Sequence, residues 1–300
     1  MYKIIVPIDF SVTSADALRF GCQIADSTGY DLEAVHIYDG YDGDQDFVVV
    51  KGSARVRARV KDMLEQFVLN HADPVTFTGT RDGNGNVPLI KTREIIGSAI
   101  NELVKQSRRE DVALIVMGGV GTGLSSRVSP VFGSVARAVA MRADCPVLLI
   151  PKIAGVPAIK SAAIAFDEPD ALIQLSAKTG FLRKALSLEM SFAHVMYPES
   201  LVEETIENNL MQSILTKAFP DYDVDFKFLP QGDITNVLLD YTLEKEIDLL
   251  ILGRHSRNFL MRLLLKSEIS GLLDVSCAPV LVIPLDESSN QLRKETSPPL

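Results

Sequence analysis

A glycine-rich stretch after an apolar run is the part of the chain best suited to bind an anion. The stretch MGGVGTGLSSRVSPVFGS, residues 117–134, has glycines at 118, 119, 121 and 123 and no acidic side chain. Glycine permits positive φ and lacks a β-carbon, so backbone N–H groups can approach a phosphate closely. Gly133 and Ser134 then open the helical segment VARAVAMRA, whose free N–H groups and positive dipole end suit phosphate. The stretch therefore indicates either a phosphate-binding loop or a generic connection between a strand and a helix.

A carboxylate follows the first apolar run of the chain. Asp9 comes directly after IIVPI, and the glycine-rich stretch begins at Met117, where a later apolar run ends. Open parallel sheets bind ligands at the carboxyl ends of their strands, beside the point at which strand order reverses. A carboxylate at that edge can accept hydrogen bonds from ribose hydroxyls or from a polar base edge. Asp9 and the glycine-rich stretch together predict a two-ended nucleotide site.

The elements that position these residues occur twice along the chain. Four pairs of matching residues mark the copies: Asp9 with Asp167, His36 with His194, Gly118 with Gly253, and Pro146 with Pro279. The successive pairs lie 158, 158, 135 and 133 residues apart, so copy one carries extra residues, two of them within or beside its glycine loop. The chain is therefore a tandem duplication whose glycine loop is longer in the first copy.

Each copy alternates short apolar runs with amphipathic stretches, the pattern of βαβ units in a parallel sheet covered on both faces. This pattern predicts an α/β fold of two tandem, open, five-stranded parallel sheets flanked by helices, each Rossmann-like. In copy one we expect strands at 3–8, 32–38, 87–91, 113–117 and 147–150, and helices at 14–27, 53–70, 95–108 and 134–142. In copy two we expect strands at 162–166, 190–195, 224–228, 249–252 and 280–283. The expected domains are 1–152 and 161–285, with a linker at 153–160 and a disordered tail at 286–300.

Composition limits the partners and the compartment. Lys and Arg number 30 against 39 Asp and Glu, so a polyphosphate must be held by a local device, and nucleic acid is not an expected partner. No segment stays uncharged over the roughly 20 residues that span a bilayer, so no membrane partner is expected. The three cysteines are widely separated, which favours a reducing compartment and predicts neither a disulfide nor a zinc site. We expect a soluble cytoplasmic protein.

The glycine-rich stretch resembles the motif of the universal stress protein family, in its nucleotide-binding branch. That motif runs Gly, two residues, Gly, nine residues, Gly, then Ser or Thr. Gly118, Gly121, Gly133 and Ser134 follow it, except that eleven residues, 122–132, separate the second and third glycines. The resemblance covers both copies and implies the adenine nucleotide alpha hydrolase-like form of the Rossmann-like fold.

The start of the chain carries the same resemblance, since Pro7, Asp9, Phe10 and Ser11 are similar to the family's Pro-x-Asp-Phe-Ser. The resemblance implies bound ATP or a related adenine nucleotide, with room for magnesium on its phosphates. In the family the aspartate takes the ribose or adenine end, the residue after the second-strand histidine lines the base pocket, and the glycine loop holds the phosphates. The implied nucleotide-binding residues are Pro7, Asp9, Ile37, Met117, Gly118, Gly121, Gly133, Ser134 and Val135.

The second copy departs from the motif where phosphate contact matters. Ser256 stands at the second glycine and Lys266 at the third, while Gly253 and the hydroxyl of Ser267 are kept. Side chains at these positions crowd the backbone surface that glycine leaves open, although the basic side chains can still attract a different anion. We expect a degenerate site in a domain that pairs with the first one. The resemblance implies that the VLLI and VLVI strands face one another across a pseudo-twofold, and it leaves open a homodimer of whole chains.

Three functions are compatible with these features. The leading one is a stress-response protein that binds an adenine nucleotide in its first copy and is regulatory rather than efficiently catalytic. The alternatives are a slow metal-dependent ATPase or phosphotransferase and an interaction scaffold without a ligand. No P-loop and no Gly-x-Ser-x-Gly elbow occurs, so no catalytic or metal-binding residue is assigned. His36 and His194 lie at matched positions in apolar runs and are expected to be structural.

Overall fold

The computed structural model describes residues 1–38, 54–72, 88–119, 132–151, 158–166, 169, 171–195, 204–230, 234–254 and 278–285. Contacts between residues divide the chain into two compact units, the first with the first five strands and the second with the last five. Most of the expected linker at 153–160 and all of the expected tail at 286–300 lie outside the described residues.

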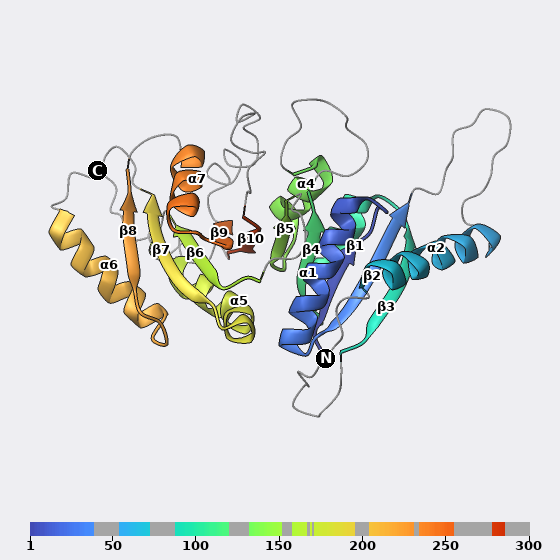
Figure 1. The fold of residues 1–300 in the computed structure, drawn as a ribbon, viewed down its shortest axis with the longest axis horizontal. Helices are drawn as coiled ribbons and strands as arrows, with labels where there is room; N and C mark the ends of the chain where they lie inside the picture. Colours follow the sequence, from blue (N-terminus) through green and yellow to red (C-terminus); the bar gives the residue numbers. More distant parts are fainter. Residues whose placement is uncertain are drawn as a thin grey trace, which may run out of the picture. The chain divides into compact units, whose positions relative to one another are not determined.

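The first unit is a parallel sheet with the strand order β3-β2-β1-β4-β5 (Figure 1). Its strands are β1 (Lys3–Pro7), β2 (Asp31–Tyr38), β3 (Ile90–Ile96), β4 (Val112–Gly118) and β5 (Val147–Ile150). The chain moves outward from β1 to β3 and then returns to β4 on the other side of β1. Strand order therefore reverses between β1 and β4, where open α/β sheets form their ligand crevices.

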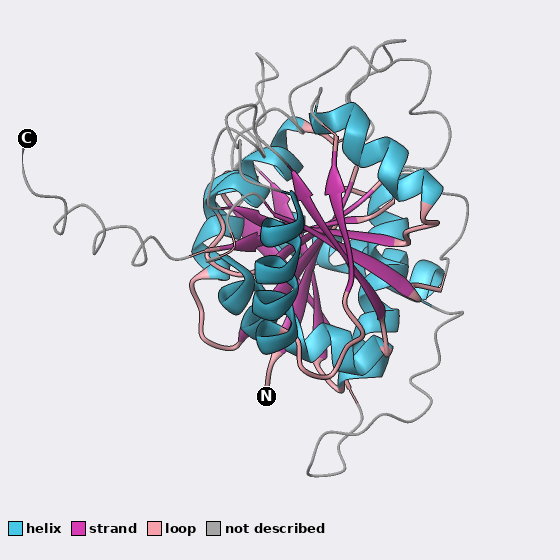
Figure 2. Ribbon diagram, turned by 90° about the vertical axis from the view of Figure 1, so that its left-hand side faces the viewer, coloured by secondary structure: helices cyan, strands magenta, loops and turns pink. Residues whose placement is uncertain are grey.

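Four helices flank this sheet: α1 (Val12–Thr28), α2 (Ala54–Ala72), α3 (Ala99–Ser107) and α4 (Ser134–Arg142). Crossovers between parallel strands are right-handed, so α1 and α2 cover one face, and α3 and α4 cover the other. Contacts agree with this arrangement, because α1 packs on α2 and α3 packs on α4. In Figure 2 the strands form the inner layer and the helices lie outside them. Ile4, Ile5 and Val6 of β1 are fully buried between the layers.

The second unit repeats the topology in the order β10-β9-β6-β7-β8, again with parallel neighbours. Its elements are β6 (Ser161–Phe166), α5 (Ala171–Leu186), β7 (Glu189–Val195), α6 (Glu204–Ala218), β8 (Asp225–Leu229), α7 (Ile234–Glu244), β9 (Leu249–Arg254) and β10 (Val280–Pro284). This order matches β5-β4-β1-β2-β3 of the first unit, strand for strand. The predicted α/β fold of two tandem five-stranded parallel sheets is confirmed.

The third strand departs most from its predicted position. We expected a strand at 87–91 and a helix from residue 95, whereas β3 ends at Ile96 and α3 begins at Ala99. Ile95 and Ile96 pair with the end of β2, and this strand pairing overrides their helical pattern. Gly97 then ends the strand with a φ of 154°, a conformation that favours glycine. The predicted helix start at residue 95 was therefore wrong, because residues 95 and 96 belong to β3 and the helix begins at Ala99.

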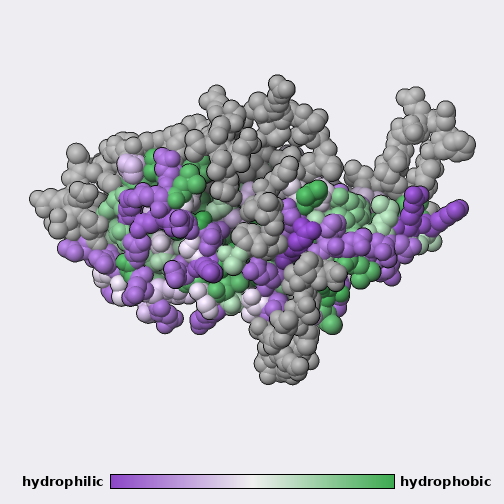
Figure 3. All heavy atoms as spheres, in the orientation of Figure 1, coloured by the Kyte–Doolittle hydropathy of each residue, from purple (hydrophilic) through white to green (hydrophobic). Residues whose placement is uncertain are grey.

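Helix α2 is held to the unit by one apolar stripe. Leu64, Val68 and Ala72 are its buried residues and follow one another at the spacing of one helical turn. The basic side chains of its first turns are all exposed: Arg55, Arg57, Arg59 and Lys61. The surface of α2 seen in Figure 3 is accordingly mostly hydrophilic. The helix therefore meets the rest of the unit through its second half.

Candidate functional site

A cavity of about 320 Å³ opens at the carboxyl edge of the first sheet, beside the reversal of strand order. The ends of β1, β2 and β4 and the first turns of α1, α3 and α4 line it. All predicted site residues that the structure describes lie on its wall: Pro7, Asp9, Ile37, Met117, Gly118, Gly133, Ser134 and Val135. Gly121 lies outside the described residues. One cavity thus unites residues that are far apart in the sequence.

The cavity has further lining residues to which sequence analysis gave no role: Ile8, Thr13, Ser14, Ala99, Leu103 and Ala136. Gly119, one of the glycines of the glycine-rich stretch, also lines it. The place of Thr13 and Ser14 could have been predicted. They follow a strand-ending aspartate closely, so they fall in the first turn of the next helix. Ala99 and Leu103 stand one turn apart on α3. Their place was hidden because the helix was expected to start earlier in the sequence.

Asp9 is exposed and is oriented by Ser11. Asp9 Oδ1 accepts a hydrogen bond from the backbone N–H of Ser11 at 3.0 Å and a second from the Ser11 hydroxyl. The Ser11 Oγ also accepts the N–H of Ser14 at 3.1 Å, which caps α1. Because the Ser11 proton is directed to Asp9, Thr13 donates in the 3.0 Å contact between their hydroxyls. Among the described residues no hydrogen bond is recorded for Asp9 Oδ2, which leaves this oxygen as an acceptor for a ligand.

Phe10 forms the turn between β1 and α1. Its φ of 62° lies in the left-handed region, which is unfavourable for a residue with a β-carbon. The ring centroid of Phe10 lies 4.6 Å from that of His36 on β2 and 5.5 Å from that of Phe67 on α2. Aromatic contacts from two elements therefore hold the residue that stands between Asp9 and Ser11.

His36 and His194 have the same role in the two units. Nδ1 of His36 lies 2.7 Å from the carbonyl oxygen of Ile8, and Nδ1 of His194 lies 3.2 Å from that of Phe166. A carbonyl oxygen can only accept, so Nδ1 is the donor in both bonds. Each histidine ties its strand to the chain where the neighbouring strand ends. This geometry supports the expectation that both histidines are structural.

Gly118 and Gly133 meet different requirements. A β-carbon on Gly118 would overlap the backbone carbonyl of Thr13, so this glycine lets β4 pack directly against the first turn of α1. Gly133 is the N-cap of α4 with φ −63° and ψ 162°, a conformation open to any residue. Its missing side chain instead leaves the start of α4 open towards the cavity that it lines.

The N-termini of α1 and α4 differ in capping. Ser11 caps α1, whereas the N-cap of α4 is Gly133, which has no side chain to cap it, and the first turn of α4 has no acidic residue. The first N–H groups of a helix have no partner within the helix, and the positive end of the dipole lies there. Ser134 and Val135 therefore present backbone N–H groups that suit an anion in the cavity.

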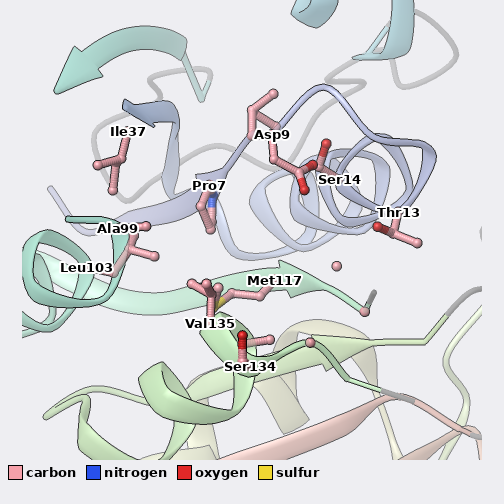
Figure 4. A pocket seen from close by; sticks show the side chains of 15 residues that line it. Pro7, Asp9, Thr13, Ser14, Ile37, Ala99, Leu103, Met117, Ser134 and Val135 are labelled. Atoms are coloured by element: carbon pink, nitrogen blue, oxygen red, sulfur yellow. The ribbon is translucent and has the colours of Figure 1, made fainter. Parts of the chain in front are cut away.

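The cavity is apolar at one end and polar at the other. Figure 4 shows Ile37, Ala99 and Leu103 at one side, Thr13 at the opposite side, and Asp9 between them. Among the described lining residues, Asp9 is the sole ionisable side chain, and the hydroxyls of Thr13, Ser14 and Ser134 supply further polar groups. An apolar ring would match the side of Ile37, Ala99 and Leu103, and a hydroxylated group would match Asp9.

The described residues also bear on metal sites, membrane helices and the second copy. Over the described residues no group of His, Cys, Asp and Glu is arranged to hold a metal ion. Within that same part of the chain, no helix is both long and apolar enough to cross a membrane. The residues of the second copy that were expected to mark a degenerate site, Ser256, Lys266 and Ser267, lie outside the described residues.

Comparison with solved structures shows the fold over both units. A universal stress protein from Archaeoglobus fulgidus superposes with a TM-score of 0.63 at 16% sequence identity, covering 94% of this chain and 98% of that chain. A functionally unknown protein from Pseudomonas aeruginosa gives a TM-score of 0.56 at 16% identity, covering 98% and 96%. A universal stress protein in complex with cAMP covers 50% of this chain and 96% of its own, at 22% identity and a TM-score of 0.34.

The family model described as "Universal stress protein family" matches residues 1–151 and 184–284, which include most of both units. Both copies therefore carry the family's sequence pattern, in agreement with the duplicated sheet topology. The chain belongs to the universal stress protein family.

Proposed function

We propose that the first unit binds ATP or a related adenine nucleotide and that the chain is a regulatory, nucleotide-binding stress-response protein. One observation carries the proposal: the exposed carboxylate of Asp9 and the start of α4, whose N-cap is Gly133, line the same cavity beside the strand reversal. A nucleotide needs acceptors for its ribose hydroxyls and donors for its phosphates. This cavity offers both on one wall.

The polarity of the cavity orders the proposed contacts. The apolar side chains of Ile37, Ala99 and Leu103 would contact the base, and Asp9 Oδ2 would accept a hydrogen bond from a ribose hydroxyl. The phosphates would lie at the N–H groups of Ser134 and Val135. In this arrangement magnesium would arrive with the nucleotide and be held mainly by the phosphates.

The second unit, in this proposal, serves as an internal partner and binds no adenine nucleotide. It has Ser256 and Lys266 at the second and third motif glycines, so it lacks the glycines that the motif has there. The expected stoichiometry is therefore one nucleotide per chain.

Isothermal titration calorimetry of the full chain with ATP, in the presence and absence of magnesium, tests the proposal. Saturable binding near one nucleotide per chain is expected. The affinities for ADP, AMP and cyclic AMP, compared with that for ATP, would show how many phosphates the site prefers. No heat and no shift in melting temperature at millimolar nucleotide would reject nucleotide binding and favour a scaffold. Steady release of phosphate during the titration would instead identify a slow ATPase.

A further inference from the structure

We propose that Phe67 on α2 is a positioning residue for the ligand-binding carboxylate of Asp9. The inference rests on the proposed nucleotide function and extends it, because Phe67 lies outside the cavity lining. Phe67 would affect nucleotide affinity without contacting the nucleotide. The route runs from Phe67 to Phe10 and from Phe10 to its neighbour Asp9.

The backbone of Phe10 is the link in this route. Phe10 has a φ of 62°, and residues with a β-carbon leave the left-handed region unless their surroundings hold them there. The hydrogen bonds between Asp9 Oδ1 and Ser11 span this same residue. A change of φ at Phe10 would therefore rotate the Asp9 carboxylate relative to the start of α1.

Two aromatic partners restrain Phe10, and they differ in how firmly they are fixed. His36 belongs to β2, and its Nδ1 is tied to the carbonyl oxygen of Ile8 at 2.7 Å. Phe67 meets Phe10 edge to face, with an angle of 82° between the rings. It belongs to α2, whose buried residues all lie in its second half. Phe67 is therefore the restraint that the position of a peripheral helix can change.

The contacts of Phe67 and its neighbour on α2 show how this helix packs against the Phe10 turn. Its ring centroid also lies 4.4 Å from that of His71, one turn further along α2. His71 Nδ1 in turn lies 3.3 Å from the guanidinium of Arg19 on α1. The same face of α2 thus meets both the Phe10 turn and the helix that follows it. A change in the position of α2 would therefore reach the Phe10 turn, and with it Asp9, through Phe67.

Removal of the Phe67 ring should weaken nucleotide binding, and it should leave the buried core residues of α2 in place. If the whole energy of the aromatic pair is lost from binding, nucleotide affinity should fall about three- to tenfold. Because the effect passes through Asp9, it should appear for ATP and be absent for inorganic triphosphate, which has no ribose.

A double-mutant cycle in the full-length chain tests the inference. The variants are Phe67→Leu, Phe67→Tyr and Asp9→Ala, with Val68→Ala as the matched control because Val68 is a buried neighbour on the same helix. ATP and triphosphate affinities are measured by calorimetry and stability by urea unfolding. Phe67→Leu should weaken ATP binding about three- to tenfold, and Phe67→Tyr, which keeps the ring, should restore it. Val68→Ala should lower stability and leave affinity unchanged.

The Asp9→Ala background decides the route. There, Phe67→Leu should cause no further loss of ATP affinity. An equal loss in both backgrounds, or unchanged affinity in Phe67→Leu alone, would overturn the positioning role while the proposed function stands. A wild-type chain that binds no ATP would overturn the proposed function and this inference with it.

Discussion

Gly118 and Thr13 are in backbone contact: a β-carbon at residue 118 would overlap the carbonyl oxygen of Thr13 and come within 3.0 Å of the Ser14 nitrogen. The last residue of β4 thus packs on the first turn of α1. Both elements border the cavity, so this contact sets how closely the first turn of α1 approaches the end of β4. The first motif glycine is needed for packing as well as for any ligand.

Gly118→Ala is therefore expected to destabilise the first unit. Backbone cannot move aside as a flexible side chain does, and overpacking typically costs about 1–3 kcal/mol. Urea unfolding of the two proteins measures the difference. Gly133→Ala is the matched control, since the conformation of residue 133 accepts a side chain. Equal stability of Gly118→Ala and the wild type would show that β4 and α1 are less tightly packed than described.

Asp9→Ala is expected to weaken ATP binding through the loss of an ionised acceptor. Hydrogen bonds to charged groups contribute about 1.5–3 kcal/mol, which corresponds to roughly a 10- to 100-fold change in affinity. Calorimetry with ATP and with inorganic triphosphate measures the effect, and only ATP should be affected. Ser11→Ala is the comparison, because it keeps the carboxylate and removes the hydroxyl bond that orients it, and it should weaken ATP binding less than Asp9→Ala does. Equal affinity losses for ATP and triphosphate would contradict a ribose contact.

His71 is expected to make the first unit less stable in mild acid. Burial, followed by the nearby charge of Arg19, lowers the pKa of His71 from its usual value of 6.5, although Asp16 opposes the shift. The unfolded chain therefore binds the proton more readily, so stability is full above pH 6.5 and falls as the pH drops through the lowered pKa. Arg19 donates to an unprotonated Nδ1, and protonation ends this bond.

Melting temperatures between pH 7.5 and 5, values chosen to bracket the usual histidine pKa of about 6.5, measure the effect. The wild type should lose more than His71→Gln over this range, because glutamine can accept from Arg19 without titrating. Parallel curves for the two proteins would contradict the role assigned to His71.

The number of sites per chain is expected to be one. Calorimetry of the full chain with ATP should fit a single class of sites, and Asp9→Ala should weaken binding at that single site. Two sites of similar affinity, with one surviving in Asp9→Ala, would show that the second unit also binds nucleotide.

Much of this arrangement could be predicted from the sequence because the duplication supplied an internal control. The matched aspartates, histidines and glycines located the two copies and most of their strands, and the glycine motif with Asp9 predicted which residues share a cavity. The part played by Thr13, Ala99 and Leu103 could not be predicted, since it depends on where α1 and α3 begin relative to the sheet edge. Ile95 and Ile96 looked helical in isolation, and only their pairing with β2 made them a strand.

The role of Phe67 was also beyond sequence reasoning. The extra residues of copy one gave no indication of how α2 would be placed, and the left-handed φ of Phe10 has no signal in a sequence without glycine at that position. Long-range packing decided both features. Sequence patterns report periodicity, whereas such contacts depend on the assembled unit.

The most direct test of the account is ATP affinity in Gly133→Asp, with Gly133→Asn as the uncharged control. Residue 133 has the extended conformation of an N-cap, so aspartate there should cap α4 and maintain or raise stability. Its carboxylate should occupy the free N–H groups and repel phosphate, weakening ATP binding about tenfold or more, and by more than asparagine does. A Gly133→Asp protein that folds and binds ATP as tightly as the wild type would contradict a phosphate site at the start of α4.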